Sequence, residues 1–180
     1  MRSNFYGLVK LTEGMIPLLK KSADGRIISV TSRAGSFQQF SEELQKKLLT
    51  PNSLEDLIEI GDLFEKTSVS GEYLKHGFSK GLVNTAYGVS KSLVISYTIL
   101  LGKLHPELLS TCTCPGPIDT DMTKQANLPF QLASTQVGAD TPYMLATESR
   151  DKIVSGAFYC EREIVSPINP SFPKWATAKN

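Results

Sequence analysis

The chain has 180 residues, 41% hydrophobic and 21% charged, which is the composition of an ordinary globular domain that can bury a core. Its 19 basic and 18 acidic residues nearly cancel, so no nucleic-acid partner is expected. The longest mostly apolar stretch, 93–101, is about half as long as a membrane span, and no apolar run follows Arg2, so neither a membrane anchor nor a signal peptide is expected.

The first part of the chain predicts a helix and then a strand. Residues 4–21 carry apolar side chains at helical spacing. We expect the buried face of this helix to consist of Leu8, Leu11, Met15, Leu18 and Leu19. Asp24-Gly25 predicts a turn, and the β-branched run 26–31 predicts a buried strand.

Residues 38–80 predict a helical insert. Ser41 and Ser53 each precede acidic residues, which is typical of a helix start. The second of these helices is expected to bury Leu57, Ile60 and Phe64. Glycines at 71, 77 and 81 are expected to end the helical part in a loop.

The remaining segments alternate between helix and strand. Helical spacing resumes over 85–103, with the expected core stripe Val89, Leu93, Tyr97 and Leu100. Residues 110–114 predict a strand, and 135–147 predict a helix that Pro142 should bend. Residues 153–160 predict a last strand, and the proline-rich tail from Ser166 is expected to be extended and loosely held. The alternation predicts an α/β fold with a mainly parallel sheet covered by helices.

The cysteine content favours a reducing, intracellular compartment. Cys112, Cys114 and Cys160 are an odd number, and Pro170 spoils the sequon at Asn169. We therefore expect a cytoplasmic protein. Cys112 and Cys114 have the spacing of small core residues on one strand face. A metal site would need further ligands at suitable spacing, so no metal is expected.

Tyr87-Gly-Val-Ser-Lys91 is the first motif with chemical content. Positions i and i+4 share a helix face, so Tyr87 and Lys91 can meet in one site. A phenol whose pKa lies near its ordinary value of about 10 transfers protons poorly at neutral pH, and a neighbouring ammonium is expected to lower that pKa. By itself the pattern is weak, because a tyrosine and a lysine four positions apart on a helix also occur by chance.

Three further segments support the motif by their order and context. Residues 25–32 form a predicted strand that ends in hydroxyls, residues 115–122 follow the next predicted strand, and Asn4 opens the first helix. Strand ends are where open α/β sheets build their sites. Each segment also has a simpler interpretation: Asn4 as a helix cap, Ser32 as an exposed strand end and Pro115-Gly116 as a turn. Together and in this order they are difficult to attribute to chance.

In this order Asn4, Ser32, Tyr87 and Lys91 resemble the catalytic tetrad of the short-chain dehydrogenase/reductase family. The insert 38–80 is similar to that of the family's monomeric carbonyl reductases and of plant reductases that act on terpene and alkaloid ketones. The resemblance covers about residues 4–165 and implies a partial Rossmann-like (doubly wound) fold. It also implies NADPH-dependent reduction of aldehydes, ketones or quinones by hydride transfer.

The resemblance assigns roles to these residues. Tyr87 would protonate the carbonyl oxygen of the substrate, and Ser32 would donate a hydrogen bond to that oxygen. Lys91 would lower the tyrosine pKa and bind the nicotinamide ribose, while Asn4 would hold a water in the proton relay. Tyr87 and Lys91 would therefore contact the cofactor too, and its nicotinamide end would lie against the loop residues Ile118, Asp119 and Thr120.

The sequence departs from the family at the start. The Gly-rich turn Thr-Gly-x-x-x-Gly-x-Gly, which holds the cofactor's pyrophosphate, and the Asn-Asn-Ala-Gly segment are absent. Relative to the family, strands one to four are absent, so we expect either an incomplete sequence of a full-length reductase or a genuine short form of the protein. We therefore expect an exposed strand edge at 26–31 and helix faces that are not covered. We also expect weak or no binding of nicotinamide dinucleotides. Pro117 stands where carbonyl reductases usually carry Trp.

These observations give the following expectations. Residues 1–165 should form the C-terminal portion of a short-chain dehydrogenase/reductase domain, and 166–180 an extended tail. The substrate should be a small-molecule carbonyl compound. A full-length enzyme of this type is expected to be a monomer, whereas this chain has faces through which it can self-associate. The alternative is a truncated, non-catalytic homologue that binds a partner through those faces.

Overall fold

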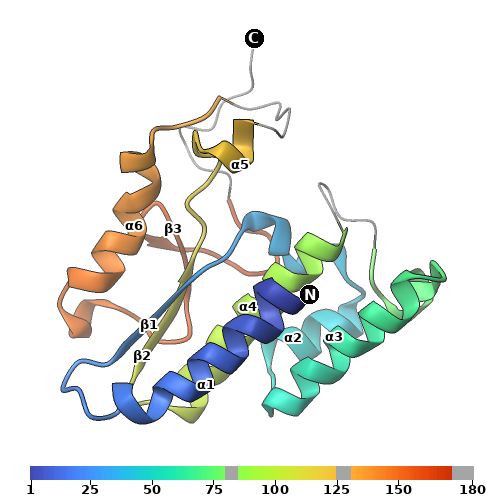
Figure 1. Ribbon diagram of the computed structural model, residues 1–180, viewed down its shortest axis with the longest axis horizontal. Coiled ribbons are helices and arrows are strands. Elements are labelled where there is room, and N and C mark those ends of the chain that lie inside the picture. The colour runs from blue at the N-terminus through green and yellow to red at the C-terminus, as the bar shows by residue number, and fades with distance from the viewer. Residues whose placement is uncertain (80–84, 125–130, 172–180) are drawn as a thin grey trace.

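The computed structural model describes residues 1–79, 85–124 and 131–171. Figure 1 shows the strands running diagonally between α4 on one side and α6 on the other. The helices are α1 (Leu8–Leu19), α2 (Glu42–Leu49), α3 (Leu54–Ser68), α4 (Thr85–Leu104), α5 (Asp121–Lys124) and α6 (Thr135–Thr147). A π-helical turn, Arg2–Gly7, leads into α1.

The sheet has the strand order β1-β2-β3-β4. The first three strands run parallel, and β4 pairs antiparallel with β3. Among the described residues β1 has a neighbour on one side alone, so the predicted exposed strand edge is confirmed, as is the α/β fold with a mainly parallel sheet. The strands are β1 (Arg26–Val30), β2 (Leu109–Thr113), β3 (Phe158–Cys160) and β4 (Glu163–Ile164).

The core lies mainly between α4 and the sheet. The stripe predicted for α4 is buried as expected, each member being at most 1% exposed: Val89, Leu93, Tyr97 and Leu100. α3 packs on the outer side of α4. On the opposite face of the sheet, Leu145 of α6 packs with Leu109 and Tyr159 in a smaller apolar cluster.

The helical insert is also confirmed. The Ser41 side chain caps α2, and Ser53 and Asp56 form a reciprocal capping box at the start of α3. α3 buries the predicted residues Leu57, Ile60 and Phe64. Gly71 and Gly77, with φ values of 76° and 83°, then turn the chain in the left-handed region that favours glycine.

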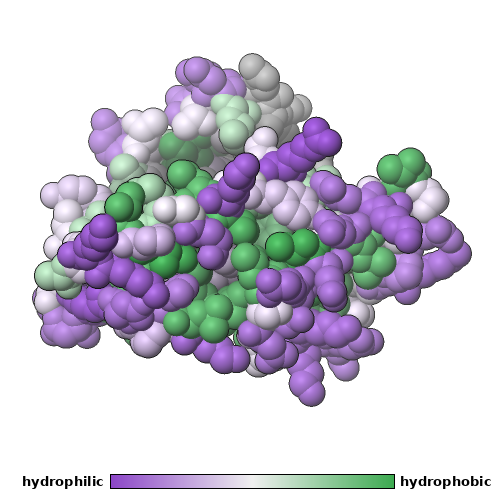
Figure 2. All heavy atoms as spheres, turned by 60° about the horizontal axis from the view of Figure 1, so that its bottom comes forward, coloured by the Kyte–Doolittle hydropathy of each residue, from purple (hydrophilic) through white to green (hydrophobic). Residues whose placement is uncertain are grey.

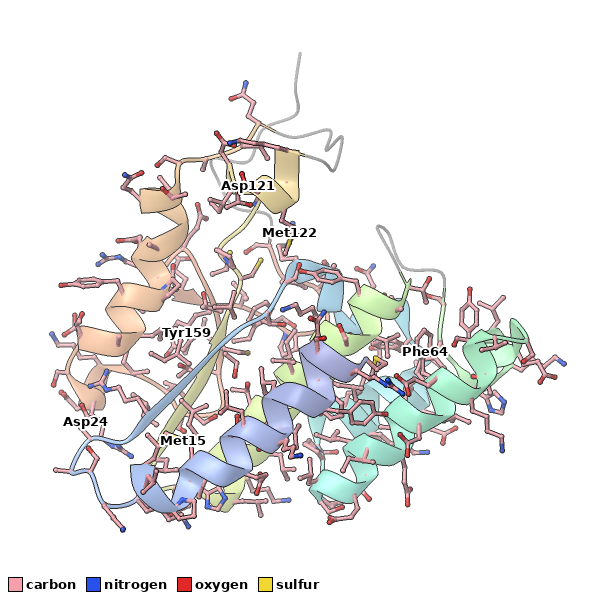
Figure 3. The ribbon with its side chains drawn as sticks, viewed as in Figure 1. Met15, Asp24, Phe64, Asp121, Met122 and Tyr159 are labelled. Carbon is pink, nitrogen blue, oxygen red and sulfur yellow. The ribbon has the colours of Figure 1, made fainter. Side chains whose placement is uncertain are left out.

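The buried face of α1 was predicted wrongly at three of its five positions, whereas Leu8 and Leu19 are partly buried against the core. Leu11, Met15 and Leu18 are 68%, 41% and 56% exposed. Figure 3 labels Met15 beside the lower part of α1, and Figure 2 shows hydrophobic atoms at the surface in the middle of the face turned forward there. The helix is apolar on two adjacent faces. The face that is buried lies beside Glu13, which accepts a hydrogen bond from Tyr97 of α4 at 2.5 Å. The residues that α1 buries are Val9, Thr12 and Ile16.

The last predicted strand, 153–160, is shorter than expected. Pairing with β2 begins at Phe158, because Gly156 takes a left-handed φ of 80° where the chain passes against α4. A Cβ on Gly102 of α4 would lie 2.7 Å from the Gly156 nitrogen, so the two backbones meet at glycines. The sequence did not predict β4, which follows directly after a two-residue turn.

The tail is not loosely held over residues 166–171. The backbone N–H groups of Phe37 and Gln38 donate hydrogen bonds to the carbonyls of Pro167 and Ile168 at 2.8 and 3.0 Å. The Arg33 guanidinium donates to the carbonyl of Pro170 at 2.6 Å. These bonds fix the segment beside the loop that follows β1. The rest of the predicted tail, 172–180, lies outside the described residues.

Candidate active site

Ser32 and Tyr87 meet at the carboxyl edge of the sheet. Ser32 follows β1 by two residues, and Tyr87 lies in the first turn of α4. The Ser32 hydroxyl is close enough to Tyr87 for a hydrogen bond from it to lower the tyrosine pKa. The Ser32 Oγ also accepts the N–H of Ala34 at 3.1 Å and so caps the 3-10 turn Arg33–Gly35. Because that bond uses a lone pair of the hydroxyl, its hydrogen is available for the tyrosine oxygen.

Two glycines allow this close approach of the turn to α4. A Cβ on Gly35 would lie 2.7 Å from the backbone of Lys91, and one on Gly88 would lie 2.8 Å from a carbonyl oxygen of the turn. Separations below 3.0 Å are not tolerated, so both positions need glycine. Sequence reasoning missed them. The available signal was their position, since Gly35 lies three residues after Ser32 and Gly88 directly after Tyr87.

Lys91 lies one helical turn from Tyr87, with its ammonium 5.6 Å from the centre of the tyrosine ring. The ammonium donates a hydrogen bond to the Val30 carbonyl at 2.9 Å. Burial raises the pKa of Tyr87 and lowers the pKa of Lys91, while the hydrogen bond from Ser32 opposes the rise for Tyr87. The expected net lowering of the tyrosine pKa is therefore wrong, because desolvation of the ring outweighs the groups that favour the phenolate.

Asn4 lies inside the π-helical turn rather than at a helix cap. Its Nδ2 donates a hydrogen bond to Ser90 Oγ at 3.1 Å, and Ser90 in turn donates to the backbone carbonyl of Tyr87 at 2.7 Å. Asn4 is thus brought against α4 beside the residue that precedes Lys91.

Ile118, Asp119 and Thr120 follow β2 at the same edge of the sheet, because β1 and β2 are parallel. Ile118 is buried and pairs with Ala133 in an isolated parallel bridge. Asp119 and Thr120 are exposed, and the Thr120 hydroxyl lies 3.2 Å from that of Thr123. The structure therefore places all three in one loop, and their contacts with a cofactor remain predictions.

Cys114 is a further group close to the tyrosine and the lysine. It is buried directly after β2, as the core interpretation predicted. A negative charge on its sulfur raises the pKa of both Tyr87 and Lys91. Sequence reasoning missed this electrostatic role, since the spacing of Cys112 and Cys114 indicates a strand face but not what lies beyond the strand end.

The groups at this edge fit one end of a nicotinamide dinucleotide. The hydroxyls of Ser32 and Tyr87 and the ammonium of Lys91 are half-buried donors of the kind that bind a ribose and a carbonyl oxygen. The sequence holds no Gly-rich turn for the pyrophosphate. In the part of the chain that the structure describes, no group of three or more His, Cys, Asp or Glu residues could hold a metal. No described helix is both long enough and apolar enough to cross a membrane.

Comparison with known proteins decides the family. No family model matches the chain. The chain is 31% identical to (+)-neomenthol dehydrogenase from Arabidopsis thaliana, over 91% of this chain and 54% of that protein. It is 30% identical to carbonyl reductase [NADPH] 1 from Sus scrofa, over 99% of this chain and 62% of that protein. The chain belongs to the short-chain dehydrogenase/reductase family. Its fold agrees with the solved salutaridine reductase from Papaver somniferum, with a TM-score of 0.72 and 27% identity over 87% of this chain and 52% of that one.

The short-chain dehydrogenase/reductase assignment confirms the resemblance seen in the sequence, including the carbonyl-reductase type and the Rossmann-like fold. The chain spans about half the length of the curated relatives that it matches. The residues of this family's tetrad that meet here, Ser32, Tyr87 and Lys91, come from the loop after β1 and the first turns of α4.

Proposed function

We propose that the chain carries the catalytic residues of an NADPH-dependent carbonyl reductase that reduces aldehydes, ketones or quinones. The observation that carries the proposal is the placement of Ser32 beside Tyr87, with Lys91 one helical turn away, at the carboxyl edge of a parallel sheet. NADPH as the cofactor is supported by the name of the relative from Sus scrofa.

Tyr87 is proposed as the general acid. A bound reduced nicotinamide would supply the hydride that reduces the carbonyl carbon. The raised pKa keeps the Tyr87 hydroxyl protonated at neutral pH, so it has a proton to donate to the carbonyl oxygen. The Ser32 hydroxyl stabilises whichever oxygen gains negative charge, the substrate oxygen or the tyrosine oxygen.

Lys91 is proposed to bind the ribose of the cofactor, and Asn4 to hold a water that relays protons. One N–H of the Lys91 ammonium is used by the Val30 carbonyl, and an ammonium has three donors, so two remain for the ribose hydroxyls. The Asn4 amide donates to Ser90, which leaves its side-chain oxygen to accept a bond from a relay water. The nicotinamide end of the cofactor would be held by Ile118, Asp119 and Thr120.

Nucleotide oxidation tests the proposal. NADPH or reduced nicotinamide mononucleotide, which lacks the half that a Gly-rich turn binds, is oxidised with menadione as acceptor and followed by absorbance. We expect turnover at millimolar nucleotide, and a loss of about 100-fold or more in Tyr87→Phe, the usual contribution of a general acid. Tyr143→Phe is the matched control, because Tyr143 on α6 is 66% exposed.

Two results would count against the proposal. The first is equal turnover by Tyr87→Phe and the wild type. The second is no turnover by a folded wild-type chain at any nucleotide concentration. The second result would favour a non-catalytic homologue that binds a partner, for which the specific observation is the apolar face of α1 formed by Leu11, Met15 and Leu18. We also expect no micromolar saturation in a fluorescence titration with NADPH.

A further inference from the structure

Two cysteines meet where β2 and β3 end. Thr113 lies opposite Tyr159 in the parallel ladder, and the N–H of Cys114 donates to the Tyr159 carbonyl at 3.0 Å. The next facing pair is therefore Cys114 and Cys160. Neighbouring strands lie about 4.8 Å apart, and residues that face each other in register point to the same side of the sheet. A disulfide needs a Cα separation of about 4.4–6.8 Å, a range that includes the usual spacing of neighbouring strands.

The two cysteines face each other and are not equivalent. A proton on Cys160 favours a negative charge on the Cys114 sulfur. That sulfur accepts the backbone N–H of Arg33 at 3.4 Å, and the backbone N–H of Gly116 also favours its charge. These donors lower the pKa of Cys114, while burial and the neighbouring sulfur raise the pKa of Cys160. The arrangement therefore favours the charge on the Cys114 sulfur and the proton on the Cys160 sulfur.

A small oxidant can reach the pair without passing through the candidate active site. Both sulfur-bearing residues line a hollow of about 210 Å³, whose wall on the α6 side includes Val137, a residue 44% exposed. Ser32, Tyr87 and Lys91 do not line this hollow. The two cysteines themselves are 5% and 4% exposed, so access is through the hollow.

The third cysteine gives an internal contrast. Cys112 lies on the same strand face as Cys114 but is 1% exposed and does not line the hollow. Burial raises the pKa of its thiol to about 12. Cys112 is therefore a protonated core residue at neutral pH and serves as the inert reference for the other two.

We propose that Cys114 and Cys160 are a modification site that hydrogen peroxide converts into an intrachain disulfide. The Cys114 thiolate attacks one peroxide oxygen, so that a sulfur–oxygen bond forms, the oxygen–oxygen bond breaks and hydroxide leaves. The Cys160 sulfur then attacks the resulting sulfenic acid, so that the sulfur–sulfur bond forms and hydroxide leaves with the Cys160 proton as water. The two thiols together lose two electrons, and peroxide is reduced to water.

Oxidation would also be felt at the candidate active site, a consequence that rests on the proposed function whereas the disulfide does not. The charge on Cys114 that raises the pKa of Tyr87 and Lys91 disappears. The N–H of Arg33, the residue after Ser32, loses its thiolate acceptor. Oxidation of Cys114 and Cys160 would thereby change the pKa of Tyr87.

Peptide mapping without reduction tests the disulfide. Trypsin separates residues 104–124, which hold Cys112 and Cys114, from residues 153–162, which hold Cys160. After peroxide treatment of the reduced chain, we expect two of the three thiols to be lost and these peptides to be joined. The link should persist in Cys112→Ser and be reversed by a thiol reductant. In Cys160→Ser we expect no link and a dimedone adduct on Cys114.

Three results would overturn the proposal: no linked peptide in the wild type, a link that persists in Cys114→Ser, or a link formed between chains. Mixing unlabelled and ¹⁵N-labelled chains before oxidation detects the last of these, because an intrachain bond joins peptides of one label only. The wild-type map needs no substitution, so a variant that fails to fold does not remove the test.

Discussion

Several buried hydroxyls on β2 have no hydrogen-bond partner among the described residues, which lowers the stability of the fold. Thr111 is 1% exposed, and its hydroxyl has no hydrogen-bond partner within the described residues. We expect Thr111→Val, which keeps the side-chain shape, to raise the free energy of unfolding by about 1 kcal/mol, since it removes an unsatisfied buried group. Urea denaturation measures the change. Thr98→Val is the control with no gain expected, because Thr98 donates to the Val94 carbonyl at 2.9 Å.

A negative charge on Cys114 is expected to affect the titration of Tyr87. A thiolate beside a phenol disfavours the phenolate, which is why Cys114 raises the pKa of Tyr87. Removing the charge with Cys114→Ala should therefore lower the Tyr87 pKa. The phenolate absorbance measures it, and a Tyr87→Phe titration identifies the transition. Cys112→Ala should leave the transition in place, because the Cys112 thiol is uncharged below a pH of about 12. An equal shift in both variants would contradict the assignment.

Residue identities at the candidate site were predictable, but their partners were not. The order of Asn4, Ser32, Tyr87 and Lys91 follows from the sequence, and helical spacing alone puts the last two on one face. The partner of a long lysine side chain depends on which carbonyl lies within reach after folding, here that of Val30. The net shift of the tyrosine pKa depends in the same way on burial, which the motif does not encode.

Gly88 lets the turn Arg33–Gly35 lie against α4, because it has no side chain. Gly88→Ala should push the turn away and weaken the hydrogen bond between Ser32 and Tyr87. Since that bond lowers the tyrosine pKa, we expect the Tyr87 pKa to rise in this variant, as measured by phenolate absorbance. Gly14→Ala is the control, because nothing lies within 4 Å of the added Cβ. The free energy of unfolding should rise by about 1 kcal/mol, and the titration of Tyr87 should not change.

The start of α3 tests how much one cap contributes to the insert. Ser53 Oγ accepts the N–H of Asp56 at 3.1 Å, and the Asp56 carboxylate accepts the N–H of Ser53 at 3.3 Å. Ser53→Ala should lower the free energy of unfolding by about 1 kcal/mol. Ser68→Ala, at the other end of the same helix, should have little effect, because Ser68 donates at the surface to the carbonyl of Glu65. Equal losses would show that the cap is not what Ser53 contributes.

Elements were predictable where the signal is local. Serine caps and glycines fixed the insert helices, and apolar spacing fixed α4. The failures concern contacts made at long range. α1 is apolar on two faces, and which of them is buried depends on contacts with other elements, such as the bond from Tyr97 of α4. The start of β3 depends on the close approach of Gly156 to Gly102. The segment 166–171 is held because its carbonyls accept hydrogen bonds from the loop after β1.

Among the described residues, an apolar stripe of α1 and one edge of β1 are uncovered. The stripe Leu11, Met15 and Leu18 on α1 is exposed, and β1 pairs with β2 along one edge alone among the described residues. Val30, the last residue of β1, is 50% exposed. A free strand edge and an exposed apolar helix face both favour association with another chain.

We therefore expect the isolated chain to self-associate as its concentration rises, through the face of α1. The double substitution Leu11→Glu and Leu18→Glu places charges on side chains that are 68% and 56% exposed, so it should leave the fold intact and shift the chain to the monomer. Sedimentation velocity over a range of concentrations measures the distribution. Val69→Glu is the matched control, because Val69 is 93% exposed but lies at the end of α3, away from α1. Association that survives the α1 substitutions would instead place the contact at the edge of β1, where charged residues replacing Val30 would be the next variant to measure.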